Sequence, residues 1–337
     1  MKKYNISYLI LFLLLFISIV FYTSKGFIEI PFFTTIKMIF SEISNNSLKD
    51  EFMKFWYVIF EVRIPRILTS TIAGAALGLS GLIFQAVLLN PLADPYILGV
   101  SSGASFGAAL ALLFNIQIFG LFTISFFSFM FAILSLILTL CISYTNKKIT
   151  KTSLILSGII VNSFFSAGLS FMKYLADEEV GSIVFWLMGS FTSKSWDDFI
   201  MISSVFFPTL IIIYFFADKM NILSLGDRNA KNLGINTTLI RVFLLIIASL
   251  LSAIVVSRTG IIGFVGLIIP HICRFIWGSD NKKLIFYTPL VGALLLSFAD
   301  NFIRIILPVE LPIGILTSLT GAPFFVFVMR KKIRRHS

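Results

Sequence analysis

The sequence predicts an all-α protein that crosses a membrane about ten times. Of its 337 residues, 58% are hydrophobic and only 13% are charged, and the mean hydropathy is +0.97. Soluble domains average about 45–50% apolar and about 25% charged residues, so this chain lacks the polar surface that a water-soluble globule needs. A spanning helix takes about 20 residues. Ten spans with short connections therefore use nearly the whole chain, 1–337, as a single transmembrane domain.

Ten apolar runs support this count. They cover residues 6–23, 67–89, 96–114, 116–143, 153–175, 197–217, 238–257, 259–277, 284–307 and 313–329. Pro and Gly breakers mark most of the joins, although 67–114 and 238–277 are each hard to divide. The first run resembles a signal peptide, but its near-span length favours a retained first span. Residues 24–55 are expected to form an ordinary outer loop.

The third run carries glycines four residues apart, at Gly99, Gly103 and Gly107. This spacing lets helix backbones approach closely within a bilayer. Tight packing inside the bundle is the simpler explanation of the pattern. A dedicated dimer interface is the alternative.

Lys and Arg gather on one side when the N-terminus and every second loop are assigned to the cytoplasm. That side holds the basic residues of 2–3, 147–151, 219–241, 274–283 and 330–335. The formal net charge of +11 is therefore a topology signal and does not indicate a nucleic-acid partner. Both termini are expected to face the cytoplasm.

No motif in the chain supplies energy or chemistry. The phosphate-binding pattern G-x-x-x-x-G-K-[ST] is absent. Asp300 is the carboxylate well inside a run, and Arg304 follows four residues later on the same helix face, so we expect the two to pair with each other. His271 has no companions for a metal site, so no metal is expected. An ion-coupled transporter acting alone and an intramembrane enzyme remain alternatives, with no catalytic residue assigned.

The longest inner connection, about 219–235, has apolar and charged sides. We expect two short amphipathic helices that separate near Gly226, with Gly234 closing the second. The expected apolar side consists of Leu223, Leu225, Ala230 and Leu233. A helix resting on the membrane surface and a docking element for a cytoplasmic partner explain this pattern equally well.

Several long motifs resemble one known family. In chain order they are residues 63–66 (RIPR), 74–81 (GAALGLSG), Gln85, 90–95 (NPLADP), 98–104 (LGVSSGA), 220–227 (MNILSLGD), 263–274 (GFVGLIIPHICR), 310–314 (ELPIG) and 321–325 (GAPFF). Together they are similar to the FecCD family of ABC importer permeases, which carry iron–siderophore complexes, haem or cobalamin. The resemblance runs from about residue 60 to residue 329.

The resemblance implies the type II ABC importer permease fold, with ten helices per subunit and two subunits, identical or paralogous, around a central pathway. It implies two separate ATPase subunits that bind ATP and Mg²⁺, so no cofactor is expected in this chain and the chain is not itself an enzyme. A periplasmic or lipid-anchored substrate-binding protein would deliver the cargo. The implied location is a prokaryotic cytoplasmic membrane. A ferric siderophore is the expected cargo, with haem and cobalamin as alternatives.

The resemblance also implies roles at both faces. The ATPase-coupling residues are expected to be Leu225, Gly226, Asp227, Arg228, Ala230, Leu233 and Gly234. On the outer side, Arg63, Arg66 and Arg304 are expected to hold glutamates of the binding protein, because an arginine fork pairs bidentately with a carboxylate. For the inner segment 219–235, the resemblance thus favours a docking element for the ATPase over a helix that rests on the membrane surface.

A gate and a pathway follow from the same resemblance. The expected inner gate consists of Asn90 and Leu92 together with Thr150, Lys151 and Thr152. Lys151 departs from the small polar residues that such a constriction calls for, so Asn90 and Leu92 rank above it. The expected translocation path is lined by Ser157, Asn162 and Ser166 on the fifth span and by Thr317 and Thr320 on the tenth.

Overall fold

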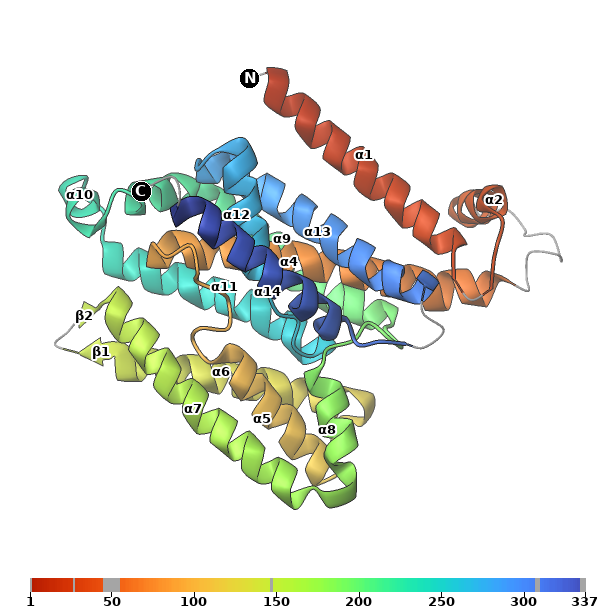
Figure 1. Ribbon diagram of the computed structural model, residues 1–337, viewed down its shortest axis with the longest axis horizontal. Coiled ribbons are helices and arrows are strands. Elements are labelled where there is room, and N and C mark those ends of the chain that lie inside the picture. Colours follow the sequence, from red (N-terminus) through yellow and green to blue (C-terminus); the bar gives the residue numbers. More distant parts are fainter. Residues whose placement is uncertain (1, 27, 45–54, 146–147, 307–309, 334–337) are drawn as a thin grey trace.

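A computed structural model describes residues 2–26, 28–44, 55–145, 148–306 and 310–333 of the chain (Figure 1). The described residues form a helical bundle in which the strands β1 (Tyr144–Thr145) and β2 (Lys148–Ile149) make one small antiparallel pair. Of the basic residues expected inside, Lys147, Arg334 and Arg335 lie outside the described residues. The predicted all-α fold is confirmed.

The described part of the chain contains ten long apolar helices, one for each run expected from the sequence. They are α1 (Lys2–Ser24), α4 (Ile64–Leu88), α5 (Val100–Leu113), α6 (Thr123–Ser143), α7 (Lys151–Leu175), α9 (Trp196–Leu223), α11 (Thr237–Thr259), α12 (Val265–Trp277), α13 (Asn281–Ile306) and α14 (Ile313–Ile333). Within the described residues, seven helices are long and apolar enough to cross a membrane, and shorter apolar helices at Val100–Leu113, Val265–Trp277 and Ile313–Pro323 complete the ten.

Short helices fill several connections. They are α2 (Phe32–Ile43), the π-helix η1 (Val58–Arg63), the 3₁₀-helices η2 (Gly120–Phe122) and η3 (Asp177–Glu179), α8 (Val180–Leu187) and α10 (Asp227–Asn232). The prediction of an ordinary loop over 24–55 is wrong for α2. That helix is amphipathic, and Met38 on its inner face is buried with Ile30 and Ile59, so local packing stabilises it.

Helix α4 lies at the centre of the bundle, and nearly all of it is buried. It crosses α13 where two glycines meet. A Cβ at Gly74 would lie 2.2 Å from the carbonyl oxygen of Gly292, and a Cβ at Gly292 would lie 2.3 Å from that of Gly74. Gly81 approaches Gly266 of α12 in the same way. The absence of side chains thus brings three helix backbones into contact.

The glycines of α5 also serve packing within the subunit. A Cβ at Gly103 would lie 2.4 Å from the carbonyl oxygen of Phe131, and one at Gly107 would lie 2.3 Å from that of Phe127, both on α6. Gly99, with a φ of 83°, begins α5 and faces Val161 of α7. The simpler explanation of this glycine pattern therefore holds.

The two breaks that the sequence left hard to place touch each other. Residues 89–99 separate α4 from α5, and residues 260–264 separate α11 from α12. The Tyr96 hydroxyl donates a hydrogen bond to the carbonyl oxygen of Ile262 at 2.9 Å. A contact between two irregular segments satisfies backbone that would otherwise be costly to bury.

Helix α1 lies along one edge of the molecule beside α13 (Figure 1). Tyr8 stacks on Tyr287 with ring centroids 4.0 Å apart, and the Ser7 and Tyr287 hydroxyls lie 2.5 Å apart. Most of the outward surface of α1 is exposed and apolar, as a helix facing lipid would be.

Candidate functional site

The inner connection after α9 folds into a compact turn and a short helix. Gly226, with a φ of 92°, precedes α10, and Gly234, with a φ of 79°, follows it. A Cβ at either position would meet no atom within 4 Å, so these glycines serve the left-handed backbone and not close packing. The prediction of two short helices is half right, because residues 219–223 continue α9 without a break.

The expected apolar side of this connection is divided between two directions. Leu223 and Ala230 are buried against the bundle, whereas Leu225 is 58% exposed and Leu233 is 60% exposed. The prediction of one apolar face is therefore wrong, because a turn with a positive φ at Gly226 separates α9 from α10 and interrupts the helical periodicity. Arg228, which lies between these two leucines in the sequence, is exposed as well. Residues 225–233 therefore form a basic and apolar knob on which two large apolar side chains are exposed, as is typical of protein contact sites.

Asp227 at the first position of α10 pairs with two cations. Its Oδ1 lies 2.6 Å from Nη2 of Arg241 on α11 and 3.7 Å from Nζ of Lys151 on α7. Arg241 is only 2% exposed, so Asp227 neutralises a buried charge. Arg241 was not among the functional residues expected from the sequence, although an arginine early in an apolar run is a signal that an acidic partner lies nearby.

The residues of the expected inner gate make local bonds. The Asn90 side-chain oxygen accepts a 2.9 Å hydrogen bond from the backbone N–H of Leu92, whose side chain is exposed. Thr150 caps α7, and its hydroxyl accepts a 3.0 Å bond from the N–H of Ser153. Thr152 is exposed. In the described part of the chain, no hydrogen bond or ion pair joins the Asn90 turn to residues 150–152.

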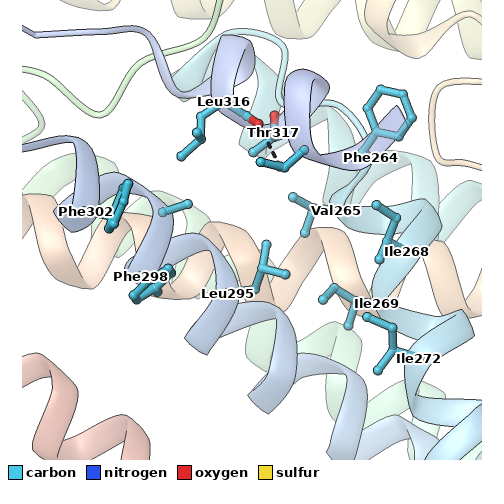
Figure 2. A pocket seen from close by; sticks show the side chains of 13 residues that line it. Phe264, Val265, Ile268, Ile269, Ile272, Leu295, Phe298, Phe302, Leu316 and Thr317 are labelled. Carbon is cyan, nitrogen blue, oxygen red and sulfur yellow. Dashed lines mark hydrogen bonds between the residues drawn. The ribbon is translucent and has the colours of Figure 1, made fainter. Parts of the chain in front are cut away.

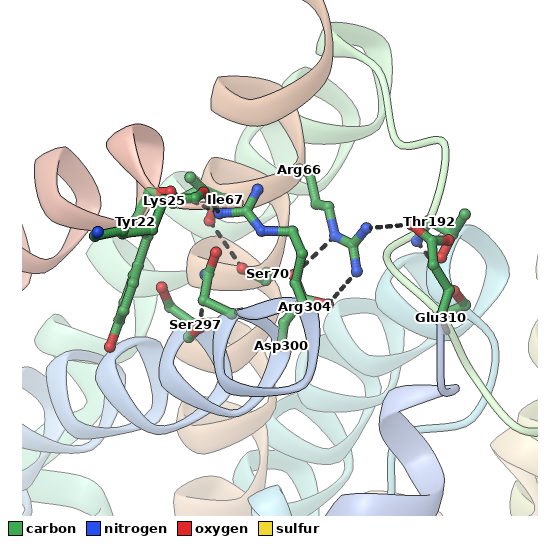
Figure 3. A network of polar contacts seen from close by, with 12 residues as sticks. Tyr22, Lys25, Arg66, Ile67, Ser70, Thr192, Ser297, Asp300, Arg304 and Glu310 are labelled. Atoms are coloured by element: carbon green, nitrogen blue, oxygen red, sulfur yellow. Dashed lines mark hydrogen bonds and ion pairs between the residues drawn. The ribbon is translucent and has the colours of Figure 1, made fainter. Parts of the chain in front are cut away.

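Two of the three arginines expected at the outer face, Arg66 and Arg304, lie in one cluster with Asp300 and Glu310 (Figure 3). Arg66 makes a two-bonded ion pair with Asp300, at 3.0 Å and 2.9 Å, and its third contact is with Glu310 at 3.0 Å. Arg63 donates to the carbonyl oxygens of Thr23, at 2.9 Å, and Ile28. Arg63 and Arg66 are both buried, so in this structure their donors serve the subunit itself.

Asp300 pairs with a different residue from the one expected. Its ion partner is Arg66, whereas Arg304 donates to the carbonyl oxygens of Tyr22, at 2.6 Å, and Lys25, at 3.0 Å. The last carbonyls of a helix have no partner inside the helix and carry partial negative charge. The end of α1 therefore attracts Arg304 away from its own helix face, and the predicted Asp300–Arg304 pair is wrong.

Glu310 completes this outer cluster. Burial raises the pKa of Glu310, but the hydrogen bond with the Thr192 side chain and the charge of Arg66 outweigh burial and hold that pKa below its usual range. The side chain stays 54% exposed. The signal in the sequence was the motif 310–314, for which no ion pair was expected.

A second outer ion pair was not anticipated. Arg258 at the end of α11 places its Nε 3.0 Å from Oδ1 of Asp198 in the first turn of α9. Both residues are buried. Arg258 and Lys194 line an outer pocket of about 520 Å³ beside α8. The Ser195–Asp198 capping box, a visible sequence pattern, places the carboxylate of Asp198 there.

The expected path residues lie on two separate helices. On α7, Ser157 is buried while Asn162 and Ser166 are exposed. On α14, the Thr317 hydroxyl donates to Gly314 O and the Thr320 hydroxyl to Leu316 O, so both are satisfied by their own helix. These two threonines border a cavity of about 520 Å³ between α12, α13 and α14, whose other walls are mainly aliphatic and aromatic (Figure 2).

A family model described as the FecCD transport family matches residues 11–331. The chain belongs to the FecCD transport family. Its fold agrees, because a solved structure described as an inward-facing conformation of a metal-chelate type ABC transporter superposes with a TM-score of 0.83 at 34% identity, covering 97% of this chain and 99% of the other. The chain is thus a multi-pass membrane protein of FecCD type, and the expected fold and family are confirmed.

FecCD relatives resemble the chain along most of its length. An uncharacterized ABC transporter permease protein, YvrB of Bacillus subtilis, is 36% identical over 98% of this chain and 94% of its own length. The molybdate import system permease protein MolB of Haemophilus influenzae is 40% identical over 81% of each chain. The hemin transport system permease protein HmuU of Yersinia pestis is 33% identical over 90% of this chain and 91% of its own. These FecCD relatives are permease subunits of ABC transporters.

Proposed function

We propose that this chain is the permease subunit of an ATP-driven importer that moves an iron complex into the cytoplasm. The observation that carries the proposal is the knob at 225–233, where the exposed Leu225 and Leu233 lie just before and just after the short helix α10. Two large exposed leucines on a charged surface favour a protein partner. Family membership supports an ATPase as that partner.

The proposed assembly contains two permease subunits, identical or paralogous, and two ATPase subunits. ATP and Mg²⁺ would bind to the ATPases, so this chain would contribute helices and no catalytic group. The knob would then sit on the cytoplasmic side, with both termini on that side in a prokaryotic cytoplasmic membrane. The excess of Lys and Arg on the connections at this end supports the orientation.

A substrate-binding protein is proposed to approach the outer cluster. Arg66 pairs there with Asp300 and Glu310, whereas Arg63 and Arg304 bond to backbone carbonyl oxygens, so among these five residues the arginines outnumber the carboxylates by one. Glu310 is half exposed, and an incoming carboxylate can replace it on Arg66. Arginine forks suit this exchange because they pair bidentately with carboxylates.

The proposed cargo is a ferric siderophore. FecCD relatives in other organisms are named for iron chelatin, Fe(3+)-citrate, hemin, cobalamin and molybdate, and the first two are iron chelates. The exposed polar residues on α7 and the locally satisfied hydroxyls on α14 support a path that binds its cargo weakly. Haem and cobalamin are the alternative cargoes.

Uptake competition tests the cargo. Cells that lack this chain, and the same cells complemented with it, are offered a labelled ferric siderophore with unlabelled siderophore, haem, cobalamin or molybdate as competitors. We expect the complemented cells to take up the labelled siderophore. Unlabelled siderophore should suppress this uptake, whereas haem, cobalamin and molybdate should not. Suppression by haem, cobalamin or molybdate alone would reassign the cargo. An ATPase that co-purifies with the chain supports the importer, whereas ion-gradient-driven uptake by the chain alone supports a secondary transporter.

A further inference from the structure

One carboxylate oxygen joins three helices at the inner face. Oδ1 of Asp227 on α10 lies 2.6 Å from the Arg241 guanidinium of α11 and 3.7 Å from the Lys151 ammonium of α7. Lys151 is the first residue of α7, next to the expected gate residues Thr150 and Thr152. The proposed ATPase-coupling element and the proposed gate are therefore in direct ionic contact.

The two halves of this triad differ in burial. Arg241 is almost fully covered, so its contact with Asp227 is a fixed anchor whose loss would leave a buried charge unpaired. The Lys151 side chain is 26% exposed and that of Asp227 is 43% exposed. Ion pairs that are exposed to this extent contribute little to the stability of the folded protein. The Lys151 contact thus sets geometry and contributes little to folding.

The start of α7 is built to transmit a displacement. Thr150 and Ser153 form a reciprocal capping box, with both backbone–side-chain bonds at 3.0 Å. A force at Lys151 therefore acts on a closed helix end and not on a loose loop. The same helix carries Ser157, Asn162 and Ser166 along the proposed path.

We propose that Lys151 is a positioning residue that fastens the gate end of α7 to α10, so that the two move as one unit when the ATPase shifts α10. This inference rests on the proposed function. It also explains why a long cation stands where the family resemblance calls for a small polar residue. The ammonium reaches out of the gate to Asp227, and the aliphatic part of the side chain spans the gap.

Two spin-label distances in the purified complex with its ATPase test the inference. Exposed Cys141 is first replaced by Ser, while Cys273 is buried. One pair of labels, at Thr152 and Asn232, joins the gate to α10. A second pair, at Asn232 and the exposed Ile276 of α12, reports α10 against the bundle. Distances are measured without nucleotide and with ATP and vanadate, so no cargo is needed.

We expect the Asn232–Ile276 distance to differ between the nucleotide-free complex and the complex with ATP and vanadate, while the Thr152–Asn232 distance stays constant. In Lys151→Met, the Thr152–Asn232 distance should change or broaden with nucleotide, and Lys151→Arg should restore it. Lys282→Met is the matched control, because it removes another inner ion pair, 2.9 Å to Asp218, away from gate and knob. It should behave as the wild type.

Two results would count against the idea in different ways. A constant Thr152–Asn232 distance in Lys151→Met would overturn the role of Lys151 while leaving the importer intact. If the Asn232–Ile276 distance in the wild-type complex is the same with and without nucleotide, the ATPase does not move α10. That result would contradict the proposed function, and the inference with it.

Discussion

Arg66 of α4 and Asp300 of α13 form a two-bonded ion pair, with Nε 3.0 Å from Oδ2 and Nη2 2.9 Å from Oδ1. Both side chains are buried, and the residues are far apart in the chain. The pair closes the outer end of the α4–α13 contact, below which Gly74 and Gly292 bring the two helices together. Charge and close packing thus fix the same helix pair.

Replacing Asp300 by Asn should destabilise the protein. Arg66 would keep only Glu310 as an ionic partner. Removing one partner of a buried ion pair lowers the free energy of unfolding by about 3–5 kcal/mol. Thermal unfolding in detergent measures the loss, with Glu179→Gln at an exposed acid as the control. If Asp300 instead relayed protons, the variant would unfold like the wild type and lose transport alone.

The contact between Arg66 and Glu310 should depend on pH in a stated direction. The folded pKa of Glu310 lies below its ordinary value of 4.5, so the stabilisation is present above that value and is lost as the pH falls through the lowered pKa. The difference in melting temperature between wild type and Glu310→Gln should therefore persist from pH 7 down to 4.5 and shrink as the pH falls further. A difference that vanishes near neutral pH would contradict this assignment.

The glycine crossing should not tolerate a methyl group. Gly74→Ala and Gly292→Ala each place a Cβ near 2.2–2.3 Å from a carbonyl oxygen of the facing helix. Overpacking of this kind costs about 1–3 kcal/mol. Gly181→Ala in α8 is the matched control, because a Cβ there would meet no atom within 4 Å. The control should keep the wild-type melting temperature, and equal melting of all three variants would refute the close contact.

Charges on the knob should separate binding from folding. Leu225→Asp and Leu233→Asp alter exposed side chains, so the purified permease should melt as the wild type does. Both variants should fail to retain the ATPase on an affinity column. Leu121→Asp is the control, because Leu121 next to α6 is 96% exposed and lies outside the knob. This variant should retain the ATPase. ATPase retention by both knob variants would remove the knob from the interface.

The sequence predicted the helices better than it predicted their charges. Apolar runs and breakers placed all ten apolar helices, and the glycine spacing in 99–107 correctly indicated close packing. The Asp300–Arg304 pair was wrong, because helix periodicity says nothing of the α1 carbonyls that attract Arg304. The contact between Lys151 and Asp227 could not be foreseen either, because it joins α7 to α10 through a turn whose angle depends on Gly226.

Reconstitution in lipid vesicles tests most sharply whether this chain is a passive permease driven by a separate ATPase. Two kinds of proteoliposome are prepared, one with the chain and its ATPase and one with the chain alone. Each is loaded with ATP or given an ion gradient, and each is supplied with the ferric chelate on its binding protein. We expect the chelate to accumulate only with the ATPase and ATP, and not at all in Leu225→Asp. Accumulation by the chain alone under an ion gradient would contradict it.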